Sequence, residues 1–476
     1  MTQIKSPYDV IVIGAGIGGL VCGCFLAKAG LKVLIAEQHH QPGGYCTSFR
    51  RRGFVFDAAA HSFGSCRENG NMRMILEALD LWKRIRVTRT VPSDIIVTPD
   101  HRITFWGSID KTIAELQRAF PAEKKNIEKF INFLINSKAI DFAALRKKTY
   151  KNLLEEYFKD NKLMTILSLP VLGNGALPPS LICAFTGSKI FTEFILDGGY
   201  YPGKEMQALP DALVKRFREL GGELRLSCFV KKIRVKDNKA SGVVLEKNGF
   251  IPSKYVVSNC DARQTFFKLL GKSIVQEEML NKIDHMIPSL STFILYVGID
   301  KPFKSLPNPG TNVWFLPYYD LEKAYSSAKE GDIDKVEGFM VRFSPDKKTI
   351  LAFVNAPFKN KTYWVRHKDK VMESFIKRID QYVIPGLSNH IIYKEAATPH
   401  TLYHYTFNYQ GAAYGWASTP AQLFTPELRQ NTFIKRLYLT GHWTTQTQGI
   451  PGVAYVGMNT AKLILRRESS RRGVTT

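Results

Sequence analysis

The first forty residues carry a strand–turn–helix–strand pattern that constrains the fold more than any other feature of the chain. Tyr8–Ile13 reads YDVIVI, a short apolar run rich in β-branched residues, which predicts a buried parallel strand. The turn GAGIGG follows at 14–19, and apolar residues at helical spacing continue until Gly30. A second apolar run at 32–36 ends at Glu37. These segments predict a β-α-β unit of the dinucleotide-binding kind.

Each residue type in this unit suits a dinucleotide. Gly14 permits the tight turn, Gly16 lets the backbone approach a pyrophosphate, and Gly19 lets helix and strand pack closely. The helix N-terminus offers N–H groups and a favourable dipole to the negative charge. A carboxylate about 20 residues after the glycines is expected to bind the ribose hydroxyls. We therefore expect a binding site that includes Gly14, Gly16, Gly18, Gly19 and Glu37.

The segment after Glu37 narrows the class of dinucleotide-binding protein. It reads GGYCTSFRRRGFVFDAAAHSF from residue 43, and it resembles the phytoene desaturase, carotenoid isomerase and retinol saturase group of amine-oxidase-like flavoproteins. The resemblance implies FAD as cofactor, with Gly43, Gly44 and Ser48–Phe49 contacting its diphosphate. Many relatives carry Arg after the glycine pair, where this chain has Tyr45. Our hypothesis is that an arginine of the run 50–52 supplies the missing charge.

Further matches to this group cover nearly the whole chain and are strongest at its two ends. Residues 198–202 resemble the segment before a helix on the substrate side, although Lys204-Glu205 replaces the usual second glycine pair. The strand 224–230 resembles one whose backbone meets the adenine near Val230, and 256–259 resembles the return strand to the FAD domain. In LYLTGHWTTQTQGIPGVAYVGMNTA, the resemblance implies flavin contacts at Gly441, Gly452 and Val453.

The rest of the chain predicts an α/β protein of discontinuous domains. The expected fold is a Rossmann-type FAD-binding domain with an inserted mixed α+β substrate domain and a helical cap. Hairpin turns are predicted at Asn238 and at Asn248-Gly249, and the apolar segment 163–194 contains too many Pro and Gly residues for one helix. The predicted boundaries are 1–70, 205–285 and 430–470 for the FAD domain, 71–204 for a helical cap or membrane-contact region, 286–429 for the substrate domain, and 471–476 for a basic flexible tail.

The resemblance implies a long apolar polyene or isoprenoid substrate that exchanges a hydride with the flavin. Desaturation, cis–trans isomerisation and saturation are all compatible with it. His61 and His442 are candidates for proton transfer, since histidine titrates near neutrality; the alternative is that each only hydrogen-bonds beside the cofactor. Residues 408–416 and Trp443 are expected either to line a polyene tunnel or to pack in the core. No catalytic triad and no metal-ligand spacing is present, so we expect no metal.

Charge and cysteine content bear on partners and location. The net charge is +24, from 66 Lys and Arg against 42 Asp and Glu, which suggests attraction to an anionic membrane surface. Candidate contacts are 146–148 and the arginines at 466, 467, 471 and 472, although any of these could be a solvated face. We expect no nucleic acid, transmembrane helix, secretory signal or disulfide framework. The expected location is cytoplasmic and peripherally membrane-associated; the oligomeric state is left open.

Two other functions are compatible with the same fold. One is an amine oxidase on a smaller substrate, which the C-terminal motif fits less well. The other is a non-catalytic isoprenoid carrier, like the Rab guanine-nucleotide dissociation inhibitors, which share this broad fold. The carrier is disfavoured because carriers have a degraded glycine loop, whereas Gly14, Gly16, Gly19 and Glu37 are intact here.

Overall fold

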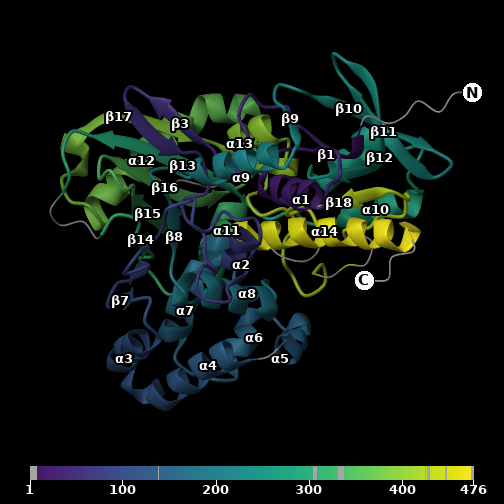
Figure 1. Ribbon diagram of the computed structural model, residues 1–476. Coiled ribbons are helices and arrows are strands. Elements are labelled where there is room, and N and C mark those ends of the chain that lie inside the picture. Colours follow the sequence, from purple (N-terminus) through teal and green to yellow (C-terminus); the bar gives the residue numbers. More distant parts are fainter. Residues whose placement is uncertain are drawn as a thin grey trace, which may run out of the picture.

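The computed structural model describes residues 8–137, 139–303, 308–330, 337–423, 425, 429–444 and 448–472. Two seven-stranded sheets form the body of the protein, and a lobe of helices extends below them (Figure 1). One sheet contains the N-terminal β-α-β unit, and the other lies beside it at the opposite side of the view. The predicted α/β fold class is confirmed by this mixture of parallel and antiparallel strands with covering helices.

The first sheet is parallel at its centre. Its order is β10-β11-β12-β1-β2-β9, with β18 also paired to β12. The pairs β12–β1, β1–β2, β2–β9 and β12–β18 are parallel, and the hairpins β10–β11 and β11–β12 are antiparallel, as the turn residues predicted. The strands are β1 Tyr8–Ile13, β2 Val33–Ala36, β9 Glu223–Arg225, β10 Val230–Lys236, β11 Lys239–Leu245, β12 Gly249–Ser258 and β18 Leu437–Leu439.

Helix α1 (Ile17–Lys28) lies against this sheet and is buried on nearly all sides. It is covered in turn by the long C-terminal helix α14 (Gly449–Arg472), which runs beside it in yellow in Figure 1. The two helices approach so closely that a Cβ at Gly457 would lie 2.4 Å from the backbone oxygen of Gly18. Other helices next to this sheet are α2 Asn71–Ala78, α9 Ala208–Glu219, η5 Gln264–Gly271 and α10 Glu277–His285.

The second sheet differs from the prediction in the origin of its strands. Its order is β17-β13-β16-β15-β14-β6-β7, and β6 and β7 come from the region 71–204 that we expected to be a helical cap. The β-branched runs DIIV and RITF form a hairpin here, and β6 pairs in parallel with β14, which buries its apolar residues. The strands are β6 Asp94–Val97, β7 Arg102–Phe105, β13 Ser291–Ile299, β14 Asn312–Phe315, β15 Phe339–Phe343, β16 Thr349–Ala356 and β17 Ile391–Ala397.

The helical lobe is formed by residues 109–196 of that region. As predicted, the segment 163–194 is broken: α7 contains Pro170 and is followed by a left-handed Ala176, and α8 continues into the π-helical turn η4. Its elements are α3 Ile109–Ala119, η2 Pro121–Glu123, α4 Lys124–Asn136, α5 Ala139–Ala144, η3 Leu145–Lys147, α6 Tyr150–Glu155, α7 Asn161–Gly175, α8 Ala184–Ile190 and η4 Phe191–Leu196.

The remaining elements lie between or beside these parts, and the long helix α12 packs against the second sheet. They are η1 Gly44–Cys46, β3 Ser48–Arg51, β4 Phe54–Asp57, β5 Val87–Arg89, β8 Tyr200–Pro202, α11 Leu321–Glu330, α12 Lys361–Tyr382, η7 Leu387–His390, α13 Pro399–Thr406 and η8 Tyr409–Gly411. Helix α14 continues through Arg472, beyond the expected start of the tail, and 473–476 lie outside the described residues. Among the described residues, no helix is long and apolar enough to span a bilayer.

Candidate active site

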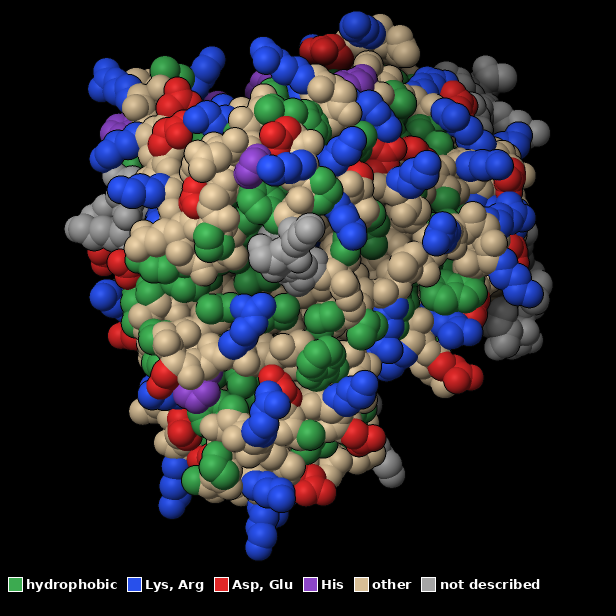
Figure 2. Space-filling model, turned by 90° about the vertical axis from the view of Figure 1, so that its left-hand side faces the viewer, with side chains coloured by type: hydrophobic (Ala, Val, Ile, Leu, Met, Phe, Trp, Pro, Cys, Tyr) green, Lys and Arg blue, Asp and Glu red, His purple; other side chains and the backbone are tan. Residues whose placement is uncertain are grey.

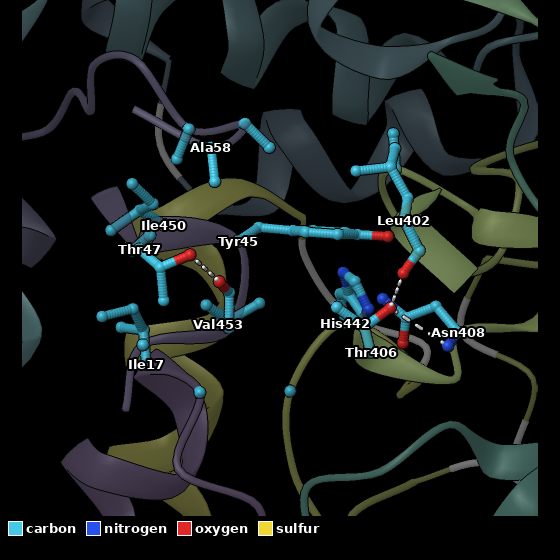
Figure 3. Close-up of a pocket in the computed structure, with 18 of the residues that line it drawn as sticks. Ile17, Tyr45, Thr47, Ala58, Leu402, Thr406, Asn408, His442, Ile450 and Val453 are labelled. Carbon is cyan, nitrogen blue, oxygen red and sulfur yellow. Dashed lines mark hydrogen bonds between the residues drawn. The ribbon is translucent and has the colours of Figure 1, made fainter. Parts of the chain in front are cut away.

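One cavity of about 740 Å³ brings together the residues that the sequence singled out. It runs from the glycine turn of the first sheet to the helical lobe and the second sheet. Among the predicted site residues, all but Gly19 line it: Gly14, Gly16, Gly18, Glu37, Gly43, Gly44, Ser48, His61, Val230, Gly441, His442, Gly452 and Val453. Segments distant in sequence therefore share one chamber, part of which is drawn in Figure 3.

The glycine turn leaves the N-terminus of α1 open toward this cavity. Gly14 has a φ of 97°, its N–H donates to the Ala36 carbonyl at 2.8 Å, and α1 then begins after Gly16 without any side-chain cap. Free N–H groups at the positive end of a helix form an anion site of the size a diphosphate needs. Gly19 serves packing, because a Cβ there would lie 2.2 Å from the Gly14 oxygen.

Asn259, which the sequence marked only as part of a resembling strand, packs beneath the turn. A Cβ at Gly16 would lie 2.9 Å from Asn259 Nδ2, and one at Gly18 would lie 2.8 Å from Asn259 Oδ1. A Cβ at Gly441 would come within 2.6 Å of the same Oδ1. The Asn259 side chain thus leaves no space for a side chain at any of these three positions.

Glu37 ties the turn to the end of strand β2. Its carboxylate accepts hydrogen bonds from the backbone N–H groups of Ala15 (2.6 Å) and His39 (2.9 Å). Burial raises the pKa of Glu37, and the backbone hydrogen bonds oppose that rise by favouring the charged form. The carboxylate lines the cavity beside Val230, at the place where a ribose is expected.

The second glycine pair is anchored to the first loop. Gly43 has a φ of 127° and donates from its N–H to the Ala15 carbonyl at 2.9 Å. The Ser48 hydroxyl donates to Asp57 at 2.8 Å and accepts from the backbone N–H of Gln207 at 3.1 Å. Asp57 and Gln207 were not recognised from the sequence, because they contact this loop only through the tertiary fold.

Tyr45 stands in the middle of the cavity, at the position for which the resemblance implied an arginine. Figure 3 shows its ring extending from the Ile450 and Val453 side toward Leu402. Its hydroxyl donates to the Ala412 carbonyl at 3.0 Å, and burial raises the pKa of Tyr45 to about 12. Tyr45 is therefore a neutral hydrogen-bonded spacer that carries no positive charge.

The arginines after Tyr45 lie in different surroundings. Arg51 lines the cavity, at 3.6 Å from Glu395, whereas Arg50 pairs with Glu205 at 3.0 Å at the surface. Both side chains are at least half exposed. Arg51 is thus the arginine of this run that can bring a positive charge to the cavity.

The C-terminal motif forms another wall of the cavity. Gly441 has a φ of 83°, and His442 follows it facing Tyr45 with ring centroids 6.1 Å apart. Trp443 is buried behind them and donates from Nε1 to Asn408 Oδ1 at 2.8 Å, so of the two alternatives it packs in the core. From 408–416, Asn408, Ala413 and Tyr414 line the cavity. Residues 445–447 of the motif lie outside the described part of the chain.

Both candidate histidines line the cavity in neutral form. Burial lowers the pKa of His442 to about 4. Burial, together with the nearby Arg342 guanidinium, lowers the pKa of His61 to about 3. Neither is therefore an imidazolium at neutral pH, and each can act there only as a neutral donor or acceptor.

The end of the cavity toward the lobe is mostly apolar and was not predicted by any motif. Its walls come from α8 and η4, from strands β13 and β16, and from α13. Each contributes side chains that are scattered in sequence, which is why a motif search does not find them. The apolar lining consists of Phe185, Ile190, Phe194, Ile294, Phe353 and Leu402.

A dinucleotide cradle joined to an apolar chamber defines a flavin-dependent oxidoreductase. The cradle fits FAD, because it combines an uncapped helix N-terminus, a carboxylate for a ribose, and glycines with no room for a side chain. The chain belongs to the flavin containing amine oxidoreductase family, whose model matches residues 17–465. FAD is accordingly its cofactor.

Three relatives of known activity match almost the full length of the chain. The all-trans-retinol 13,14-reductase of Danio rerio is 23% identical over 98% of this chain and 87% of its own length. Prolycopene isomerase 2 of an Oncidium hybrid cultivar is 26% identical over 95% and 83%. The lycopene-forming phytoene desaturase of Pseudescherichia vulneris is 26% identical over 96% and 98%. The chain is thus similar to enzymes with three different reactions.

Solved structures support the fold. An oxidoreductase from Methanosarcina mazei superposes with a TM-score of 0.66, at 16% identity, over 95% of this chain and 99% of its own. At this level of identity the likeness concerns the arrangement of domains and not the substrate.

We predict that Glu37→Gln weakens FAD binding about tenfold or more. The substitution removes the negative charge of the carboxylate that accepts hydrogen bonds from two backbone N–H groups. A hydrogen bond to a charged group contributes about 1.5–3 kcal/mol. The measurement is a titration of apoprotein with FAD, followed by the quenching of flavin fluorescence. Glu246→Gln, at an exposed ion pair with Lys231, is the matched control and should bind FAD as the wild type does.

We further predict that replacing His442 by Gln leaves the shape of the pH–rate profile unchanged between about pH 5.5 and 8.5. With a pKa of about 4, the histidine loses its proton below this window, so its charge is constant within it. The measurement is the rate of flavin reduction or reoxidation as a function of pH. A wild-type inflection near pH 6.5 that disappears in the variant would show that His442 titrates during the reaction.

Proposed function

We propose that this protein exchanges a hydride between FAD and a long apolar polyene or isoprenoid. The observation that carries the proposal is the apolar end of the cavity, which continues from Gly441 and His442 to the helices α8 and η4. A chamber lined by aliphatic and aromatic side chains binds a hydrocarbon by removing its surface from water. The three relatives, named for a retinol, a prolycopene and a phytoene reaction, support the same substrate class.

The residues of the chain divide into those that hold the cofactor and those that hold the substrate. Glu37, the open N-terminus of α1 and the loop at Gly43-Gly44 hold FAD, and the flavin supplies the hydride chemistry when bound. Phe353 and Leu402 lie along the substrate chamber and exclude water from it. Tyr45 and His442, both neutral, contact the space between the two groups without supplying a charge.

The direction of hydride transfer decides which of three reactions is catalysed. Desaturation moves a hydride from the substrate to FAD and releases a proton from the neighbouring carbon. Saturation would transfer a hydride from reduced flavin to one carbon and a proton from water to its neighbour, and isomerisation would use reduced flavin without net oxidation. An amine oxidation on a smaller substrate is the second candidate, favoured by the description of the matching family.

A membrane surface is the proposed source of such a substrate. Ile140 on α5 is 78% exposed and Leu181, before α8, is 40% exposed, in the same lobe as the basic residues 146–148. Helix α8 lines the cavity, so this part of the lobe adjoins the substrate chamber. We call Ile140, Leu181 and 146–148 the α5 surface. On the face in Figure 2, by contrast, Lys and Arg side chains are spread among acidic ones and form no single patch.

A product analysis tests the reaction. The protein is expressed in cells that already accumulate phytoene or a cis-lycopene, and the pigments are separated with full absorption spectra. A longer conjugated chain is expected for a desaturase, a shorter one for a saturase, and an altered cis–trans pattern at constant conjugation length for an isomerase. Unchanged pigments with FAD-loaded protein would reject these polyenes, and turnover of an added amine would establish the second candidate.

We predict that the protein sediments with vesicles containing phosphatidylserine at low salt, and less so at high salt. The exposed basic residues provide the attraction and Ile140 the apolar contact, so Ile140→Asp should reduce the bound fraction severalfold. Val365→Asp, at a residue 74% exposed on α12 far from the α5 surface, is the matched control (Figure 1). Equal binding by both variants would reject the α5 surface as the docking site.

A further inference from the structure

The wall of the substrate chamber formed by α8 and η4 contains a cation among apolar side chains. One face of this continuous helical segment points into the cavity and includes Phe185, Ile190 and Phe194. Lys189 and Glu193 lie on the same face, at helical spacing from the apolar residues. Lys189 is 40% exposed, so it stands at the edge of the chamber, where its ammonium can meet a polar group of a bound ligand. The position of Lys189 therefore calls for a ligand group that interacts with an ammonium.

The Glu193 carboxylate pairs only weakly with the Lys189 ammonium. Its carboxylate is bound by the Arg67 guanidinium at 2.6 and 2.9 Å, a bidentate pair that uses both oxygens. Lys189 Nζ lies 4.0 Å from Glu193 Oε1, beyond hydrogen-bond distance, and 4.0 Å from the centre of the Phe142 ring. The ammonium is thus held in place by Phe142 and the distant carboxylate, and its N–H groups remain available to an oxygen acceptor.

The charges around this point favour an oxygen-bearing or anionic group. Arg67, Arg89 and Lys189 are positive, while Glu193 and Asp197 are negative. Arg89 adds to the cluster by donating from Nε to the Asp197 carbonyl at 2.7 Å. Arg67 is thus bound by both carboxylates and Arg89 by backbone carbonyls, whereas Lys189 Nζ meets its carboxylate partner only at 4.0 Å. Desolvation of Lys189 lowers its pKa, which a negatively charged or hydrogen-bond-accepting partner would reverse.

We propose that Lys189 binds an oxygen function, a hydroxyl or a carboxylate, at the end of the isoprenoid chain. The inference rests on the proposed function and names the substrate class more closely. The chain would enter with its apolar part toward Gly441 and His442 and its oxygen at Lys189, whose side chain is 40% exposed at the edge of the chamber. Lys189 would thereby fix which bond of the chain stands beside the cofactor.

Three probes of equal chain length test this subsite: all-trans-retinoic acid, all-trans-retinol and the corresponding hydrocarbon, axerophthene. Their binding to FAD-loaded protein is followed by the change in flavin absorption. The wild type is expected to bind the acid or the alcohol more tightly than the hydrocarbon. Lys189→Met should weaken binding of the preferred oxygenated probe about tenfold and leave axerophthene within about twofold. Which of the two probes loses more affinity distinguishes a carboxylate from a hydroxyl ligand.

Lys151→Met is the matched control, because Lys151 lies in the same lobe, pairs with Glu155 at 3.8 Å and does not line the cavity. It should bind all three probes as the wild type does. If Lys189→Met binds all three as tightly as the wild type, the subsite is rejected while the polyene function stands. If none of the probes binds wild-type protein, the subsite is rejected, and the product analysis decides the proposed function separately.

Discussion

The close packing of Asn259 against three glycines is the contact on which the cofactor site depends. Asn259 follows strand β12 and donates from its N–H to the Ile13 carbonyl at 2.9 Å, which fixes it beside the first strand. Its side chain then fills the space next to Gly16, Gly18 and Gly441. The start of α1 and the C-terminal motif are thereby held together, so the open helix N-terminus and the wall formed by the motif share one cavity.

The cavity is polar at the end next to the glycine turn and mostly apolar at the end toward the lobe. At the glycine turn, Glu37 and the N–H groups of α1 provide polar contacts that suit a dinucleotide. At the lobe, Phe353 and Leu402 provide an apolar wall, and Lys189 marks its edge. The groups between these ends, including Tyr45 and His442, are neutral at physiological pH. A hydride transfer needs alignment and exclusion of water more than a charged acid or base, and this distribution provides both.

The local sequence pattern was sufficient to predict features that a single continuous segment forms. The β-α-β unit, the hairpin turns at Asn238 and 248–249, and the interruption of the segment 163–194 were all predicted from adjacent residues, although α7 continues through Pro170 and ends only at Gly175. The assignment of 71–204 to a helical cap was wrong in part, because β6 and β7 join the second sheet. Whether a short β-branched run becomes a strand of a given sheet depends on a partner, here β14, that lies more than two hundred residues away.

The sequence by itself determined the dinucleotide fold and the class of cofactor, because glycine spacing and Glu37 act through the backbone of a single unit. Only the tertiary structure decided the rest of the site. Asn259 and Lys189 line the cavity from different elements, and Gln207 supports it through Ser48. No local sequence pattern predicts the role of any of the three. Contacts between distant segments depend on how sheets and helices pack, and a motif within one segment does not predict that packing.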